Sequence, residues 1–370
     1  MNEEARQQVT SRLGSARRLL VVAHARPDGD ALGSMAALAA AARASGREAR
    51  MLLAGEGGVP HRYGFLFPAE SPAGAADFAA LADAADLIVV VDTCAFAQLD
   101  GLEPALRARR EKVVVVDHHA TADDVGADRW IDTSAAAAGV MVGELIPALG
   151  WPLPAQAAEA LLAAITSDTG WLRFSNTDGR ALRAAAALVD SGVGVDSLYG
   201  RLFEADRPER IRLIARALAS LEMHCADRVA TMRLRLLDFD ETGARPDETE
   251  NLVNEAMRMG RVEVGILLSE AAEGQGDRPA GPPIVRVSLR SRGQVDVAAV
   301  ARLFGGGGHT RAAGLRSALG METLRHRLVA ACAEALQDGG GQAGPGDSGG
   351  APDTQHPAPN AQGGAGNASL

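Results

Sequence analysis

The sequence contains few cysteines and no long apolar run, and each shortage excludes a class of protein. The three cysteines are an odd number without the spacing of a metal motif, which argues against a disulfide-stapled secreted domain. No stretch reaches the roughly 18 apolar residues of a membrane span, and residues 1–18 are charged and lack an apolar signal segment. We therefore expect a cytoplasmic protein in a reducing compartment, with no membrane partner.

Positive charge and aromatic side chains are also in short supply. Lysine and arginine total 37 against 47 aspartates and glutamates, for a net charge of -10. Long nucleic acids are bound largely through Lys and Arg on their phosphates, so the charge excludes a long nucleic acid as partner. Any nucleic-acid substrate should be short and held locally. Aromatic residues make up 4% of the chain, so stacking of a base on Tyr63 competes with a place for that ring in the core.

The length of 370 residues exceeds the usual size of one core, which favours two domains. Up to about residue 191, runs of Val and Ile alternate with helical stretches, as in a parallel sheet covered on both faces. Beyond it, strands are expected at 230–236, 262–269 and 284–290, with helices at 248–259, 295–304 and 321–337. The expected fold class is α/β, with a parallel-sheet domain over 1–194, a helical connector over 195–222, a smaller α/β domain over 223–337 and a disordered Gly/Pro-rich tail over 338–370.

Four short clusters of aspartate and histidine are the most informative feature, because each follows an apolar run. In open α/β sheets ligands bind at the carboxyl ends of the strands, so the clusters should face one cleft. Their three histidines and five aspartates would repel one another away from water unless cations neutralised them. The clusters therefore predict a metal site, and the ligand count suits two ions. The clusters are His24-Ala25-Arg26-Pro27-Asp28-Gly29-Asp30, Asp92, Asp117-His118-His119 and Asp168.

Each cluster taken alone has a simpler explanation. Asp92 before Thr93, or Asp168 before Thr169, would serve as a helix cap or turn residue. His118 and His119 are adjacent, and neighbouring side chains on an extended segment point to opposite faces. Only the conjunction of all four clusters favours the metal site.

The second domain carries a run of four glycines, Gly305, Gly306, Gly307 and Gly308, followed by His309 and Arg311. Without Cβ atoms, backbone N–H groups can approach an anion closely, which is typical of a phosphate cradle, although a flexible turn has the same composition. Arg290 and Ser291 close the preceding strand, and a guanidinium there suits bidentate contact with phosphate. A solvated strand end is the alternative for these two residues.

The order His24-x3-Asp28-x-Asp30, Asp92, Asp117-His118-His119, Asp168 and then Gly-Gly-Gly-His resembles the DHH phosphoesterase superfamily over about residues 18–336. Segments 26–34, 166–177 and 251–254 are similar to its short-oligonucleotide branch, the NrnA-type nanoRNases. The resemblance implies a DHH domain, a DHH-associated domain and a metal-dependent phosphoesterase. Its expected substrates are short RNA oligonucleotides and dinucleotides, cleaved to mononucleotides, and 3′-phosphoadenosine 5′-phosphate, which loses its 3′-phosphate.

The resemblance also implies roles for single residues. His24 and Asp28 would hold one ion, Asp30, His118 and Asp168 the other, and Asp92 would bridge them. His119 would face the substrate as a catalytic residue, and Asp117 would fix an imidazole tautomer. Mn²⁺ is the expected ion, with Mg²⁺ or Co²⁺ as possible substitutes. Substrate binding would fall to Arg290, Ser291, Gly305, Gly306, Gly307, Gly308 and His309.

Other functions remain open at this point. A phosphodiesterase acting on cyclic or linear dinucleotides would use the same site, and the two differ in whether the base pockets admit a ring. A manganese pyrophosphatase would share the amino-terminal clusters but not the glycine run. A nucleotide-binding protein without turnover would keep the cleft alone, and the intact Asp92 and Asp168 argue against it. A homodimer is expected from the resemblance only.

Overall fold

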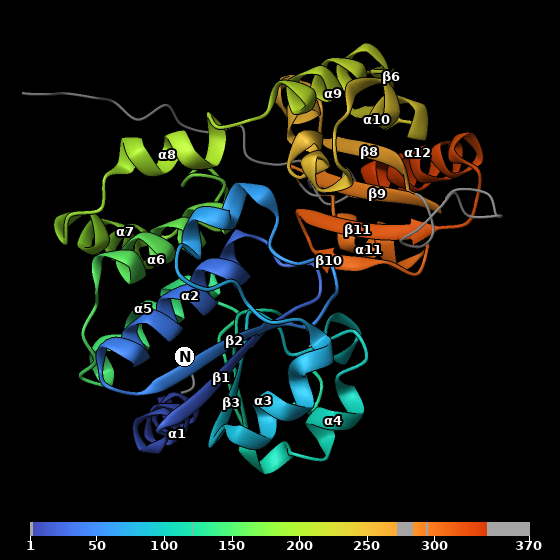
Figure 1. Cartoon of the computed structure of the whole chain (residues 1–370). Coiled ribbons are helices and arrows are strands. Elements are labelled where there is room, and N and C mark those ends of the chain that lie inside the picture. Colours follow the sequence, from blue (N-terminus) through green and yellow to red (C-terminus); the bar gives the residue numbers. More distant parts are fainter. Residues whose placement is uncertain (1–2, 121, 272–283, 294, 339–370) are drawn as a thin grey trace, which may run out of the picture. The chain divides into compact units, whose positions relative to one another are not determined.

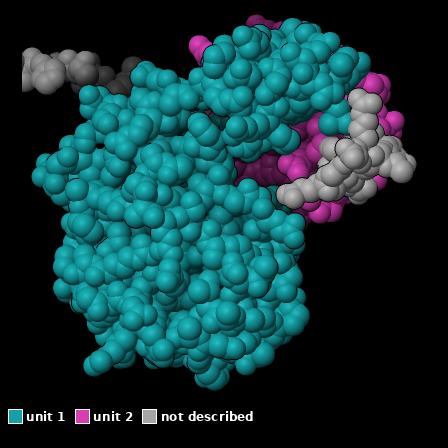
Figure 2. All heavy atoms as spheres, in the orientation of Figure 1, with its two compact units in different colours: residues 1–219, 234–252 teal, residues 220–233, 253–370 magenta. Residues whose placement is uncertain are grey.

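The computed structural model describes residues 3–120, 122–271, 284–293 and 295–338 (Figure 1). Contacts divide the chain into two compact units, residues 1–219 with 234–252 and residues 220–233 with 253–370 (Figure 2). The domain limits expected from the sequence stay predictions. The expected disordered tail lies outside the described residues, apart from Asp338 at the end of a helix.

The first unit is built on a parallel sheet with the strand order β2-β1-β3-β4-β5. The valines of β4 are buried on both faces of the sheet, which is why the strand is apolar throughout rather than alternating with polar residues. The strands are β1 (Arg18–Ala23), β2 (Glu48–Leu53), β3 (Leu87–Val91), β4 (Val113–Asp117) and β5 (Asp128–Ile131). The parallel-sheet α/β fold predicted from the sequence is confirmed.

Helices cover both faces of this sheet (Figure 1). Leu19 and Val21 of β1 belong to the core formed with α2 (Gly29–Ala44), α5 (Ala138–Ala148) and α6 (Ala155–Asp168). Leu20 and Val22 point the other way, into the core formed with α3 (Phe78–Ala84) and α4 (Glu103–Arg107). Alternate residues of one strand thus serve two cores, as the pleat requires.

The strand order reverses at β1: β2 is added on one side of it, and β3, β4 and β5 are added on the other. Ligands of open α/β sheets bind outside the carboxyl ends of the strands at such a switch point. The residues that follow β1 and β3 are therefore placed where the fold favours a site.

The rest of the first unit is helical. It contains α1 (Glu3–Ser15), α7 (Gly179–Asp190), α8 (Val195–Phe203), α9 (Pro208–Ala219), α10 (Leu236–Thr242) and the 3₁₀ turns η1 (His61–Leu66), η2 (Ala75–Asp77), η3 (Phe96–Gln98), η4 (Arg110–Lys112) and η5 (Pro246–Thr249). The helix expected over 248–259 is wrong as an α-helix. The chain there forms η5 and a second 3₁₀ turn, η6 (Leu252–Arg258), because Asn251 between them has a left-handed backbone with φ 61°.

The second unit has its own sheet, with the strand order β10-β11-β9-β8-β7-β6. Its core packs the strands against α11 (Val297–Arg302) and α12 (Met321–Asp338). The strands are β6 (Glu222–His224), β7 (Val229–Leu234), β8 (Val264–Ala271), β9 (Ile284–Ser291), β10 (Gly307–His309) and β11 (Ala312–Ser317). The smaller α/β domain predicted after the connector is confirmed as an α/β unit.

None of the helices in the described part of the chain combines the length and the apolar character that a bilayer span requires.

Candidate metal centre

The first cluster spans the end of β1 and the start of α2. His24 follows the strand directly, and Asp28 is the N-cap of α2, where its Oδ1 accepts hydrogen bonds from the backbone N–H groups of Asp30 (3.0 Å) and Ala31 (3.1 Å). Capping fixes the Asp28 carboxylate at the strand end. It also puts Asp30 in the first helical turn, where its side chain is fully buried.

Gly29 lets this cluster approach the end of α6. A Cβ atom on Gly29 would lie 1.9 Å from the Oγ of Ser167, so any side chain would separate the two segments. The glycine therefore allows Asp28 and Asp30 to lie near Asp168, the last residue of α6. Asp168 was expected at a strand end, and this is wrong: the residue ends a helix of 14 residues.

Asp92 lies just beyond β3 in an unusual backbone conformation. Its φ is 61°, in the left-handed region, and its N–H donates to Val116 O at 2.9 Å. A non-glycine residue rarely adopts this conformation, and such residues gather at functional sites. The turn aims a carboxylate that is 1% exposed at the histidines of the neighbouring strand end.

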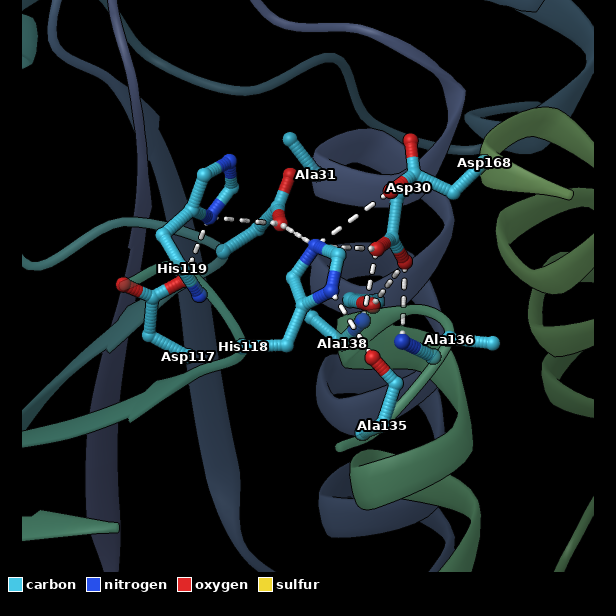
Figure 3. A network of polar contacts seen from close by, with 12 residues as sticks. Asp30, Ala31, Asp117, His118, His119, Ala135, Ala136, Ala138 and Asp168 are labelled. Carbon is cyan, nitrogen blue, oxygen red and sulfur yellow. Dashed lines mark hydrogen bonds and ion pairs between the residues drawn. The ribbon is translucent and has the colours of Figure 1, made fainter. Parts of the chain in front are cut away.

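Both histidines after β4 reach Asp92. His118 Nε2 lies 3.4 Å and His119 Nδ1 lies 3.8 Å from Asp92 Oδ1. The alternative in which they point to opposite faces is wrong, because the strand ends at Asp117 and the pleat no longer governs the two residues. Their rings instead meet edge to face, with centroids 4.7 Å apart (Figure 3).

The remaining distances join the clusters into one site. His24 Nε2 lies 3.6 Å from Asp92 Oδ2. His118 Nε2 lies 3.6 Å from Asp30 Oδ2 and 3.3 Å from Asp168 Oδ2. Three sets of side chains in the first unit have ligand atoms close enough to share an ion, and Asp92 belongs to each of them: His24, Asp28 and Asp92; Asp30, Asp92 and His118; and Asp92, Asp117 and His119.

The donor set fits divalent cations. Separations of 3.3–3.6 Å between imidazole nitrogen and carboxylate oxygen are long for hydrogen bonds. They suit ligands that share an ion at bonds of about 2.0–2.2 Å. Asp92 Oδ1 is buried and accepts no hydrogen bond from the described residues. Two divalent ions would also balance the four carboxylates, Asp28, Asp30, Asp92 and Asp168.

The pKa values of the cluster record its crowding without cations. Burial opposes the charged form of His118, but Asp92, Asp168 and Asp30 outweigh it and raise its pKa to about 11. Burial and the charge of Asp28 raise the pKa of Asp168 to about 7. Burial also raises the pKa of Asp30, with Asp92 adding to the effect. Burial of Asp92 acts in the same direction, but His118 and His24 prevail and lower its pKa. Repulsion among these carboxylates thus favours the binding of positive charge, either protons or cations, in this cluster.

Backbone groups that sequence reasoning missed support the ligands. The N–H groups of Ala138 and Gly139, at the start of α5, donate to the Asp30 carboxylate at 2.6 and 2.8 Å. His118 Nδ1 lies 3.1 Å from Ala135 O, an acceptor that leaves Nε2 facing the carboxylates (Figure 3). The only signal in the sequence is a run of small residues after β5, and backbone donors leave no residue type to recognise.

Asp117 contacts His119 rather than the centre of the cluster. Its Oδ1 accepts from His119 Nδ1 at 2.7 Å and from the His119 backbone N–H at 3.2 Å. The other ring nitrogen of His119 points away from Asp117 (Figure 3). Burial disfavours the charged ring, but the hydrogen bond to Asp117 outweighs it and raises the pKa of His119.

Tyr63 and Cys94 lie in buried surroundings near the site. Tyr63 is 2% exposed and its hydroxyl donates to Glu250 Oε1 at 2.7 Å, so its ring belongs to the core. Cys94 is fully buried, and burial raises the pKa of its thiol to about 11.

In the second unit, part of the glycine run serves its own hairpin. β10 pairs antiparallel with β11, and Gly306 and Gly308 lie where a Cβ would come within 2.3 Å of Gly314 O and 2.5 Å of Ala312 O. Gly305 and Gly307 have open space in the Cβ direction. The cradle expected from the sequence stays a prediction for these residues and for the exposed His309.

Arg290 and Ser291 end β9. Arg290 pairs in register with Ala312 of β11, and Ser291 Oγ donates to Val295 O at 2.7 Å. The serine hydroxyl thus holds the turn toward α11. Substrate binding by these two residues stays a prediction.

Comparison with known proteins gives two family matches. Residues 18–165 match the DHH family, N-terminal domain, and residues 227–338 match the DHHA1 domain. The chain is 31% identical over 326 residues to a Thermus thermophilus protein named bifunctional oligoribonuclease and PAP phosphatase NrnA, covering 87% of this chain and 91% of that protein. It is 26% identical over 301 residues to the Bacillus subtilis protein of the same name, covering 79% and 86%.

Among solved structures, the fold is similar to a crystal structure of an exopolyphosphatase-related protein from Bacteroides fragilis. The TM-score is 0.79 at 20% sequence identity, over 91% of this chain and 96% of the other. This likeness supports the two-unit α/β fold.

Proposed function

The chain belongs to the DHH family, and from this premise we propose that it is a metal-dependent phosphoesterase of short RNA. It hydrolyses short RNA oligonucleotides and dinucleotides to mononucleotides and removes the 3′-phosphate of 3′-phosphoadenosine 5′-phosphate. The relatives from Thermus thermophilus and Bacillus subtilis carry both activities in their names. The observation that carries the proposal is that Asp92 belongs both to the set His24, Asp28 and Asp92 and to the set Asp30, Asp92 and His118.

The ligand chemistry favours Mn²⁺. Carboxylate oxygens with two imidazoles suit this ion, and Mg²⁺ or Co²⁺ are the expected substitutes. His24, Asp28 and Asp92 would hold one ion, and Asp30, Asp92, His118 and Asp168 would hold the other. Ions bound there would supply Lewis-acid activation of water and neutralise charge on the phosphoryl oxygens.

The protein's own residues orient this chemistry. Ala135 O fixes the tautomer of His118 so that Nε2 faces the carboxylates. The N–H groups of Ala138 and Gly139 hold the Asp30 carboxylate in one rotamer. Asp117 accepts from His119 Nδ1 and stabilises the charged ring, so His119 Nε2 carries a proton that it gives to the leaving oxygen.

Substrate recognition belongs in part to the second unit. Arg290 and His309 supply cationic or hydrogen-bonding groups, and the open space in the Cβ direction of Gly305 and Gly307 lets a phosphate approach the backbone there. Ser291 completes this set. The net charge of -10 favours substrates of a few nucleotides over long chains.

Location and assembly complete the proposal. The protein acts in the cytoplasm, in keeping with three cysteines that are all free. It forms a homodimer, for which the exposed Leu182 and Val189, two turns apart on α7, supply an apolar surface. Light scattering of the purified chain tests the dimer, and a monomer at micromolar concentration contradicts it.

The test of the function is a substrate panel. Purified protein is incubated with linear and cyclic dinucleotides, RNA of three to forty nucleotides, 3′-phosphoadenosine 5′-phosphate and pyrophosphate, with Mn²⁺ or with a chelator. We expect Mn²⁺-dependent release of mononucleotides from the shortest RNAs and of phosphate from the bisphosphate. Dominant cleavage of the cyclic dinucleotide would instead make the protein a cyclic dinucleotide phosphodiesterase. Equal rates on the longest and shortest RNA would contradict the preference for short substrates.

Two variants of residues that flank β3 sharpen this test. Asp92→Asn replaces the shared carboxylate with a neutral amide, and we expect kcat to fall by at least about 1,000-fold, which corresponds to about 4 kcal/mol of transition-state stabilisation. Asp86→Asn is the matched control, because Asp86 precedes the same strand and pairs with Arg18 at 2.8 Å. It should retain the wild-type kcat. Full activity of Asp92→Asn would refute the metal centre.

A further inference from the structure

The segment that joins β5 to α5 supports the candidate metal centre through backbone groups. The loop comprises residues 132–137, and Ala138 and Gly139 begin α5. Ala135 O faces His118 Nδ1 at 3.1 Å, and the N–H groups of Ala138 and Gly139 donate to Asp30. Alanine side chains cannot set the position of these groups, so their position depends on the polar side chains at the start of the loop and on the residues that those side chains contact.

Asp132 fixes the first turn of this loop. Its side chain is 3% exposed, and its Oδ1 accepts from the backbone N–H of Ser134 at 3.1 Å and from Ser134 Oγ at 2.6 Å. Its own backbone N–H donates to Asp117 O at 3.0 Å. A buried carboxylate with this many donors has a lowered pKa, and burial, which alone would raise it, is overcome by Ser134 and Arg180.

Arg180 of α7 holds the second oxygen of Asp132. Its Nη1 donates to Asp132 Oδ2 at 2.6 Å, while Nε and Nη2 donate to the two oxygens of Glu144 at 2.6 and 2.8 Å. The Arg180 side chain is 16% exposed, and its guanidinium cross-links the end of β5 with α5 and α7. Such a planar fork fixes both partners in direction as well as distance, which a lysine ammonium does not do.

We propose that Arg180 is a positioning residue for the metal centre, acting through Asp132 on the loop 132–137 and through that loop on His118 and Asp30. The hydrogen bonds and ion pairs of Arg180 among the described residues go to Asp132 and Glu144, neither of which is a candidate ligand. A second tie supports the same loop from the other side, because Asn176 Nδ2 donates to Ala136 O and to Asp168 O, both at 3.1 Å. The inference rests on the proposed metal-dependent function.

A measurement of Mn²⁺ affinity distinguishes a positioning role of Arg180 from a salt bridge that only stabilises the fold. Mn²⁺ binding is measured by calorimetry on chelator-treated protein, for wild type, Arg180→Met and Arg180→Lys. We expect Arg180→Met to weaken the binding of at least one ion by about 10- to 100-fold, the usual cost of losing outer support of a ligand. Arg180→Lys should fall between, because lysine keeps the charge and loses the fork. kcat for a dinucleotide should fall, while KM stays within about twofold.

The matched control is Arg12→Met. Arg12 Nη1 lies 2.7 Å from Asp128 Oδ2, so this pair holds the opposite end of the same strand, β5. Losing it should lower the midpoint of thermal unfolding without changing the Mn²⁺ affinity. An equal loss of affinity in both variants would mean that β5 acts as a general support and would overturn the specific role of Arg180.

Amide hydrogen exchange gives a readout that needs neither metal nor activity. In metal-free Arg180→Met, the amides of Ala138 and Gly139 should exchange at least about tenfold faster than in wild type, because their loop opens more often. The amides of β5 near Asp128 should keep their rates. Unchanged exchange at Ala138 and Gly139 would overturn the proposal.

The remaining outcomes are also decisive. If Arg180→Met does not fold, Ser134→Ala replaces it: the variant removes only the 2.6 Å bond to Asp132 and should weaken Mn²⁺ binding severalfold. A folded Arg180→Met or Ser134→Ala with wild-type affinity refutes the positioning role alone. A wild-type protein that binds no Mn²⁺ and hydrolyses nothing refutes the proposed function instead.

Discussion

At the scale of single residues, the candidate metal centre brings together buried titratable groups whose charged forms repel one another. His118 has its pKa raised to about 11 and Asp168 to about 7, so without cations both carry protons near neutral pH. Cations bind the deprotonated forms, which makes metal binding compete with protonation. The apparent affinity therefore rises with pH, steeply below about 7 and still measurably above it.

This competition predicts that Mn²⁺ binding releases protons. Calorimetric titrations at pH 7 in buffers of different ionisation enthalpy should give binding enthalpies that depend linearly on that enthalpy, with the sign of proton release. His118 contributes a proton, and Asp168 contributes part of one. Asp168→Asn should reduce the slope because it removes one source of released protons. A slope of zero in wild type would show that the cluster is deprotonated before metal arrives.

The candidate ligands could be predicted from the sequence, but the contacts that position them could not. Asp92 could be predicted at a strand end because five buried apolar residues precede it. Its left-handed φ of 61° could not, since it depends on the contact with Val116 of the next strand. The same holds for Asp132 and Arg180, whose pairing across 48 positions leaves no local pattern.

At the scale of elements, close packing of α2 on α6 brings two of the ligand clusters together. Gly33 of α2 faces α6, and a Cβ there would lie 2.4 Å from Ala160 O and 2.8 Å from Ala164 Cβ. Both helices are rich in alanine, so their axes approach closely enough for Asp30 and Asp168 to share His118.

Gly33→Ala should therefore destabilise the protein by about 1–3 kcal/mol, the cost of overpacking a close contact. Gly143→Ala is the matched control, because Gly143 also lies in a buried helix and its Cβ would meet Leu161 Cδ1 at an ordinary 3.7 Å. It should stabilise α5 by up to about 1 kcal/mol through helix propensity. Chemical unfolding of the two variants checks both signs. Equal stabilities would contradict the packing argument.

Periodicity predicted the strands well because a sheet covered on both faces demands uninterrupted apolar runs. It placed Asp168 wrongly, since Ala-Ile-Thr-Ser-Asp reads equally as a buried strand or as the last turn of a buried helix. The 3₁₀ turn η6 escaped prediction for a related reason. Its sequence has the apolar spacing of a helix, and the left-handed Asn251 before it has no unambiguous sequence signal.

At the scale of the whole molecule, the excess of negative charge limits which nucleic acids bind. Long RNA gains affinity by releasing many counterions, and a chain of net charge -10 offers little of that gain. A dinucleotide engages few phosphates, so its binding depends on local contacts.

We therefore expect KM for a dinucleotide to rise by no more than about tenfold between 50 and 200 mM salt. A forty-nucleotide RNA should inhibit dinucleotide hydrolysis no better than a trinucleotide at equal concentration of ends. Initial-rate measurements with the two competitors test this. Strong, salt-sensitive inhibition by the long RNA would reveal a basic surface that the net charge conceals.

The succession of an α/β unit and a smaller α/β unit could be predicted, because each leaves its own periodic pattern. The return of residues 234–252 to the first unit could not. That segment is held by contacts such as Tyr63 to Glu250 and Arg210 to the backbone of Glu248, which join positions far apart in sequence. The local sequence of residues 234–252 does not indicate that this segment packs against the first unit.

Because the candidate ligands depend on backbone groups near α5, substitutions in this segment should affect activity less than insertions or deletions. Exchanging one small side chain for another at Ala135 leaves the carbonyl in place. Inserting or deleting a single codon between Asp132 and Gly139 shifts the supporting groups by about 3.8 Å, beyond the reach of any hydrogen bond. Loop length, more than residue identity, should therefore distinguish active from inactive descendants of this protein.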